Sequence, residues 1–113
     1  MHELSVVQDL IKLCETNAMN QNCIKVTRVE VKVGKLSGVE PHYLQSTFDC
    51  FKEGSLCSEA QLILNIEDIS VKCLDCGYIG VIEAGEFTCP KCGGRNLEIT
   101  GGEDLILQRL EME

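Results

Sequence analysis

Two C-x2-C pairs are the feature that most constrains how this sequence can fold. The first pair reads CLDC at 73–76 and the second reads CPKC at 89–92. Two intervening residues let the backbone turn so that both sulfurs of a pair face one point, and a glycine follows each pair, where such turns favour tolerance of positive φ. Four thiolates suit tetrahedral Zn²⁺, with Zn–S bonds of about 2.3 Å. Because no coordination position stays open, the pattern predicts a structural zinc site at Cys73, Cys76, Cys89 and Cys92.

The expected cellular location favours metal binding by the cysteines over disulfide formation. The start, Met-His-Glu, has no basic leader and no long apolar run, so we expect the chain to stay in the cytoplasm. Eight cysteines in a reducing compartment are not expected to form a disulfide framework. The alternatives are two disulfides or free thiols, and an iron site of the rubredoxin type has the same ligands, so the spacing does not identify the metal by itself.

Helical and strand patterns flank the cysteine segment. Apolar spacing predicts helices over 3–19 and 41–53, while alternating or continuous apolar runs predict strands at 26–36, 60–69 and 103–112. The second helix is long enough to connect two parallel strands. The expected fold class is therefore α+β or α/β, a small mixed sheet packed with two helices plus an inserted zinc-ribbon-like segment. We expect residues 1–69 with 101–113 to form one domain, and residues 70–100 to be inserted between its strands.

The same patterns predict which side chains are buried. The core face of the first helix is expected to contain Leu4, Val7, Ile11, Cys14 and Ala18, widened by Val6, Leu10 and Leu13. In the second helix Leu44, Phe48 and Phe51 share a face, and the second strand points Leu62, Leu64 and Ile66 inward. Of the cysteines without ligand spacing, Cys14 and Cys50 are expected to be buried, and Cys23 and Cys57 lie in turn-like stretches that favour exposure.

The charge balance argues against two classes of partner. The formal net charge is −8, from 18 acidic and 10 basic residues. Nucleic-acid binding requires a surplus of Lys and Arg, and an anionic membrane attracts basic segments. The cysteine segment offers at most Tyr78 and Phe87 for base stacking. We predict no binding to nucleic acid or membranes; a zinc-ribbon interaction or nucleic-acid-binding module is the alternative function. No Ser-His-Asp set or phosphate loop is present, so no enzymatic activity is expected.

The Met-His start can itself chelate a metal ion. The amine of Met1, the backbone nitrogen of His2 and the imidazole of His2 form fused five- and six-membered rings in one plane. Planar nitrogen donors suit Cu(II) or Ni(II). The fourth corner is open to Glu3 or to a carboxylate from elsewhere. The competing interpretation is that His2 is a solvated residue ahead of a helix, with Glu3 favoured by the helix dipole. His42, at the start of the second helix, is expected at the surface.

Several motifs together resemble one known family. MHELSVV at the start, the helix–strand–helix pattern that follows, SGVEP before the second helix, and CLDC with CPKC are similar to the HypA/HybF family of nickel metallochaperones over essentially the whole chain. The resemblance implies a protein that binds Ni(II) and delivers it for the maturation of nickel–iron hydrogenase. It implies His2 as the key nickel ligand and the four cysteines as structural zinc ligands, and it makes Glu40 a candidate ligand beside Met1 and Glu3.

The resemblance also implies partners. These are the hydrogenase maturation GTPase HypB, the hydrogenase large subunit and, in some bacteria, urease accessory proteins. A homodimer is a further possibility that the sequence leaves open. Some relatives carry histidines beside the zinc cysteines, but the segment 73–92 contains none. A metal-sensing role of the zinc site is therefore not expected.

Overall fold

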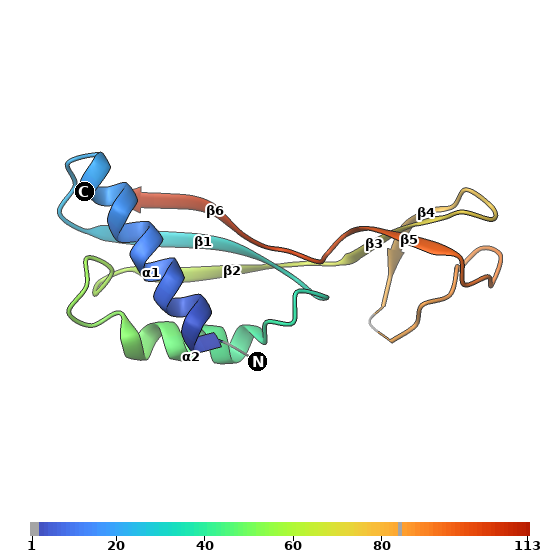
Figure 1. Ribbon diagram of the computed structural model, residues 1–113, viewed down its shortest axis with the longest axis horizontal. Coiled ribbons are helices and arrows are strands. Elements are labelled where there is room, and N and C mark those ends of the chain that lie inside the picture. Colours follow the sequence, from blue (N-terminus) through green and yellow to red (C-terminus); the bar gives the residue numbers. More distant parts are fainter. Residues whose placement is uncertain (1–2, 84) are drawn as a thin grey trace.

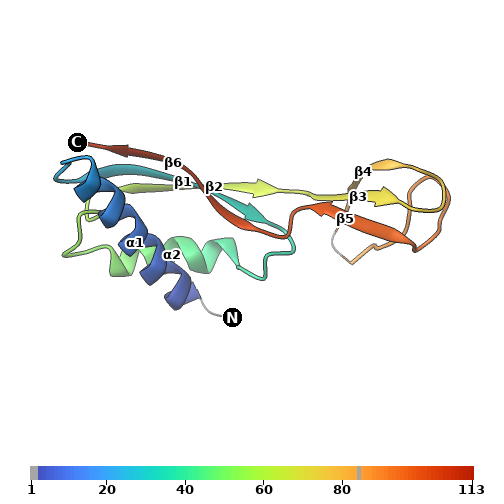
Figure 2. The same ribbon diagram turned by 45° about the horizontal axis from the view of Figure 1, so that its top comes forward.

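The computed structural model describes residues 3–83 and 85–113 and places two helices and six strands within them. In chain order these are α1 (Glu3–Asn20), β1 (Val26–Gly34), α2 (Pro41–Phe51), β2 (Gln61–Glu67), β3 (Ile69–Cys73), β4 (Ile79–Ile82), β5 (Leu97–Gly101) and β6 (Leu105–Met112). The molecule is elongated, at 53 × 25 × 17 Å, with both helices at one end and the cysteine segment at the other (Figure 1, Figure 2). The expected fold class is confirmed.

The first sheet has the strand order β2-β1-β6. β1 and β2 are parallel because α2 carries the chain back between them, and β6 pairs antiparallel with β1. Val29, Val31 and Val33 of β1 are at most 1% exposed, as their alternation predicted. The cysteine segment leaves the first sheet after β2 and returns to it at β6.

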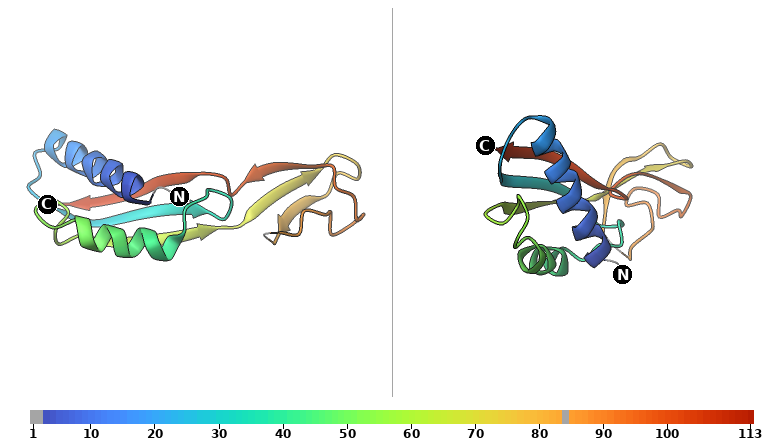
Figure 3. Two further views of the ribbon diagram at one scale, coloured as in Figure 1. Left: turned by 60° about the horizontal axis from the view of Figure 1, so that its bottom comes forward. Right: turned by 60° about the vertical axis from the view of Figure 1, so that its left-hand side comes forward.

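Both helices pack on one face of this sheet (Figure 3). The buried side chains of α1 are Val7, Leu10, Ile11, Cys14 and Ala18, and those of α2 are Leu44 and Phe48. Complete burial of a side chain such as Phe48 is worth about 1.5–3 kcal/mol. This layer of helices on a three-stranded sheet forms the main hydrophobic core.

Four apolar side chains that the sequence placed in the core lie at the surface instead. Leu4, Leu13, Phe51 and Ile66 are 45%, 47%, 52% and 48% exposed. Leu4 and Phe51 sit at helix ends and Ile66 near the end of an edge strand, where fewer elements pack over a side chain. Leu13 lines a groove between α1 and β6.

The predictions for the remaining cysteines were right in part. Cys14 is buried as expected, whereas Cys50 is exposed and Cys57 is buried, and Cys23 is half-buried. Cys57 is buried because its loop folds against α1: a carboxylate oxygen of Glu15 accepts a hydrogen bond from the Leu56 amide at 3.1 Å.

The cysteine segment contains a second sheet, with the strand order β4-β3-β5 and antiparallel pairing throughout. Ile69, Val71 and Ile82 form its small core, and Leu36 from the first part of the chain packs against them. The division of the chain into two domains stays a prediction.

The two sheets join at a narrow waist, which we define as residues 34–36, 67–69 and 101–104. The amide of Leu36 donates to the Gly102 carbonyl at 2.7 Å, and the amide of Gly102 donates to Glu67 Oε1 at 3.0 Å. Lys35 Nζ and Asp68 Oδ1 form an ion pair at 2.6 Å. These bonds tie the three chain segments of the waist together.

Among the described residues, no helix combines the length and apolarity needed to cross a membrane.

Candidate metal centre

Two similar turns bring the four cysteines together. In each turn the glycine that follows the pair donates its amide to the carbonyl of the first cysteine, Gly77 to Cys73 at 2.9 Å and Gly93 to Cys89 at 2.8 Å. Both glycines have positive φ, 79° and 74°, as the sequence predicted for tight turns. The repeated local geometry aims both sulfurs of each pair inward.

The sulfur geometry fits a tetrahedral metal ion. The Sγ atoms of Cys73 and Cys92 are 3.7 Å apart, and those of Cys76 and Cys89 are 3.5 Å apart. All four sulfurs lie within 4.8 Å of one another. Ligands about 2.3 Å from a tetrahedral centre have edges of about 3.8 Å, so an ion fits between them. The four predicted ligands therefore form a metal-binding cluster.

Backbone amides stabilise negative charge on the sulfurs. The amides of Lys91 and Cys92 approach Cys89 Sγ at 3.4 Å, and the Gly94 amide approaches Cys92 Sγ at 3.4 Å. Removal from water raises the pKa of the Cys89 thiol, but these amides and the adjacent thiols outweigh it and bring that pKa to about 6. The Tyr78 amide lowers the pKa of Cys76, but burial and the other three sulfurs raise it to about 12. A cation at the centre favours the thiolate at every position.

The residues that couple the two turns could not be recognised from the sequence. The amide of Leu74 in the first turn donates to the Asn96 carbonyl at 2.9 Å, and the Asn96 side chain donates to Asp75 at 3.4 Å. Asn96 lies just after the second turn, so it bonds to the first one across the cluster. No periodicity or motif marks this role.

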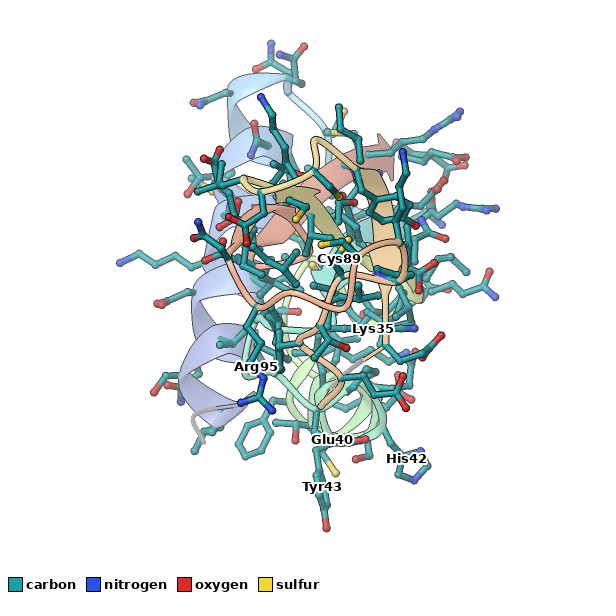
Figure 4. All side chains as sticks on the ribbon, turned by 90° about the vertical axis from the view of Figure 1, so that its right-hand side faces the viewer. Lys35, Glu40, His42, Tyr43, Cys89 and Arg95 are labelled. Atoms are coloured by element: carbon teal, nitrogen blue, oxygen red, sulfur yellow. The ribbon has the colours of Figure 1, made fainter. Side chains whose placement is uncertain are left out.

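Glu40 caps the second helix. Its Oε2 accepts a hydrogen bond from the Tyr43 amide at 2.7 Å, and Pro41 fills the first helical position. Figure 4 looks along the long axis from the cysteine end and places Glu40 apart from Cys89. His42 and Tyr43 project from the same end of α2 into solvent, so His42 is at the surface as expected.

The other proposed nickel ligands can be placed only in part. Met1 and His2 lie outside the described residues. Glu3 is the first residue of α1. Whether these residues bind nickel stays a prediction.

A comparison with known families decides the identity. The family model described as "Hydrogenase/urease nickel incorporation, metallochaperone, hypA" matches residues 1–112. The chain belongs to the HypA family. It is 46% identical over 113 residues to the hydrogenase maturation factor HypA of Aquifex aeolicus, covering all of this chain and 98% of the relative.

Solved HypA structures share the fold. The solution structure of the Ni metallochaperone HypA from Helicobacter pylori is 38% identical with a TM-score of 0.69, over 99% of this chain and 97% of that one. A second structure, titled "Solution structure of HypA protein", is 36% identical with a TM-score of 0.74, over 100% and 97%. The resemblance drawn from the motifs is confirmed. The chain is therefore a member of a nickel metallochaperone family of hydrogenase maturation, and it has a four-cysteine metal-binding cluster.

Proposed function

We propose that this protein binds one Ni(II) ion at its free N-terminus and delivers it to the nickel–iron hydrogenase large subunit, working in the cytoplasm with the GTPase HypB. The observation that carries the proposal is the family match over residues 1–112, which includes the Met-His-Glu start. Urease, reached through its accessory proteins, is a second candidate recipient because the family description includes it. No catalytic step is part of the proposal.

Three nitrogen donors form the proposed nickel site. They are the Met1 amine, the His2 amide and the His2 imidazole. This planar set of nitrogen ligands suits Ni(II), whereas Zn²⁺ has no preference for planar coordination. α1 begins at Glu3, so the chelate is attached directly to a helix. A small number of protein ligands permits stepwise exchange of the metal ion to an acceptor. Nickel binding displaces protons, so it weakens below the imidazole pKa of about 6.5.

We propose Glu40 as the fourth donor, with Glu3 as the alternative. Asp, Asn, Ser and Thr are the preferred helix caps, because a short side chain reaches back to the first amides. Glu40 performs this cap with the longer side chain and uses Oε2 for it. A carboxylate held in this way beside the start of α2 is oriented before a metal arrives.

We propose zinc as the ion of the four-cysteine cluster, where it has a structural role. Four sulfur ligands complete a tetrahedron, and such sites contribute folding energy to small segments. Zinc and iron are distinguished by elemental analysis and by colour, since an iron–thiolate site absorbs visible light and a zinc site does not.

Nickel titration of untagged protein tests the N-terminal site. We expect one Ni(II) per chain, lost in His2→Ala and in protein acetylated at its N-terminus, with zinc content unchanged in both. X-ray absorption of the nickel-loaded protein should report nitrogen and oxygen ligands. Unchanged nickel stoichiometry after acetylation, or a nickel site made of sulfur alone, would contradict the proposal.

Glu40→Gln tests the fourth donor. The amide oxygen of glutamine still accepts the Tyr43 bond, so α2 keeps its cap while the carboxylate is lost. We expect nickel affinity to fall at least tenfold, about 1.4 kcal/mol, with circular dichroism unchanged. Asp49→Asn, at the other end of α2, is the matched control. If Glu3→Gln gives the loss and Glu40→Gln does not, Glu3 is the fourth donor.

A further inference from the structure

The helices cover the first sheet unevenly. α2 lies toward β2, while α1 crosses the sheet diagonally, with its C-terminal end over β6 and its N-terminal end beside α2 (Figure 1, Figure 3). Within the part of the chain that the structure describes, no helix therefore lies above the part of β6 nearer the waist (Figure 1). Leu105, Leu107 and Leu110 contact the core from β6 but stay half-buried.

A groove follows this uncovered strip. We call it the α1–β6 groove: Val6, Leu10 and Leu13 form its helix wall, Leu105 and Leu107 its strand wall, and Val31 its floor. This apolar part has a volume of about 230 Å³. A more open and more polar continuation of about 510 Å³ extends from Asn17 on α1 and Gln21, just after α1, to Met112 on β6.

The alternation of side chains along β6 indicates that its groove-facing surface is suited to being covered by another apolar surface. On the face that bears no helix, β6 presents Arg109 and Glu111, which pair with each other at 3.4 Å. On the helix-bearing face it presents leucines opposite Val33, Val31 and Val29 of β1. Leu13, across the groove, is 47% exposed. Apolar side chains thus line a surface that this chain only half covers, a pattern typical of binding surfaces.

We propose that the α1–β6 groove binds an amphipathic helix of a partner protein, with an aliphatic face toward the leucines and a basic residue opposite Asp9. The two helices of this chain form a layer on one face of the first sheet. A partner helix over the uncovered part of β6 would extend this layer as a third helix. From Val6 to its last residue, Asn20, α1 is about 21 Å long, which matches a helix of about 15 residues.

A helix fits this site better than an added strand. The pairing of β1 with β6 shifts register between Glu30 and Val31, so that Gln108 has no partner in β1. Such a bulge twists an edge strand and makes it a poor template for further pairing. The apolar contacts also lie on the face of β6 and not along its edge.

Charge selects the chemistry of the partner. Of the described residues that line the apolar part, Asp9 alone is charged. Glu103 and Asp104 directly precede Leu105 at the same end of the groove. The chain has a net charge of −8, so a second copy would bring like charges together, whereas a basic helix gains from them.

Binding of a designed peptide to the zinc-loaded, nickel-free full chain tests the proposal. The probe is a 15-residue helix with leucines at positions i, i+3, i+4 and i+7 and lysines toward one end, followed by amide chemical shifts. We expect shifts at α1 and β6. Leu13→Ser should weaken binding about tenfold through lost apolar contact, and Asp9→Asn about twofold. Both side chains are exposed, so both variants should fold.

Matched controls make the outcome decisive. Met19→Ser removes another exposed apolar side chain of α1, 67% exposed and outside the groove, and should leave binding unchanged. A peptide with glutamates in place of lysines should bind more weakly. Equal effects of Leu13→Ser and Met19→Ser, or no binding of the helical probe, would overturn the proposal. Tighter binding of an extended peptide than of the helical probe would also overturn it. A dimer that is detected by sedimentation and is dissociated by Leu13→Ser would do the same.

Discussion

Gly102 is the residue on which the geometry of the waist depends most directly. Its φ is +91°, and an added Cβ would lie 2.6 Å from the Asp68 carbonyl oxygen. We expect Gly102→Ala to lower the free energy of unfolding by about 2–5 kcal/mol, the sum of left-handed strain and a steric clash. Urea unfolding at saturating zinc measures the loss. Gly54→Ala is the control, because Gly54 has φ +80° but nothing within 4 Å of its Cβ; strain alone should cost about 1–2 kcal/mol. If Gly102→Ala and Gly54→Ala lower the free energy of unfolding equally, the proposed steric clash at Gly102 is wrong.

At this scale the sequence predicted some environments and missed others. The four ligand cysteines could be found because two C-x2-C turns specify their geometry locally, and Cys14 because it lies within a clear helical stripe. Cys57 could not, because its burial depends on the bond from Leu56 to Glu15, formed between residues far apart in sequence. The hydrogen bonds of Asn96 across the cluster could not be predicted for the same reason, because they also join residues far apart in sequence.

The second sheet is the element whose order depends most on the metal. Its core consists of Ile69, Val71 and Ile82, too few apolar side chains to hold the two cysteine turns. We expect a strong chelator to disorder residues 70–100 while the amide signals of β1 and α1 persist. Cys92→Ser should reproduce this effect in part, and Cys50→Ser, at an exposed cysteine outside the cluster, should not. A metal-free protein with an intact second sheet would contradict the expectation.

Elements with a sustained period were predictable and short ones were not. α1, α2 and β1 follow from apolar spacing over nine or more residues, and the parallel pair β1–β2 follows from the length of the connection. β3, β4 and β5 have four or five residues each, interrupted by cysteine turns and glycines, so their sheet showed no period. Side chains at helix and strand ends, such as Phe51, were assigned to the core because periodicity does not report where a neighbouring element stops.

At the scale of the whole molecule, the waist determines how the metal-binding end is held relative to the helices. Glu67 contributes at two points: Oε1 accepts the Gly102 amide at 3.0 Å and Oε2 pairs with Lys32 Nζ at 3.5 Å. Each partner belongs to a different segment, so this one carboxylate joins β1, the end of β2 and the β5–β6 link. Since the carboxylate and the ammonium are both partly exposed, the stability at stake is only about 1 kcal/mol.

The effect on relative motion should exceed the effect on stability. We expect nitrogen relaxation to give one common rotational correlation time for β1 and β5 in the unaltered protein. We expect Glu67→Ala to let the two sheets reorient independently, so that the two strands then give different values. Glu103→Ala, an exposed carboxylate beside Gly102, should leave that common value unchanged. If Glu67→Ala also keeps a single correlation time, the glycine contacts and the Lys35–Asp68 pair suffice to hold the waist. The relative orientation of the two sheets would then depend on backbone packing and on the Lys35–Asp68 pair, and not on this carboxylate.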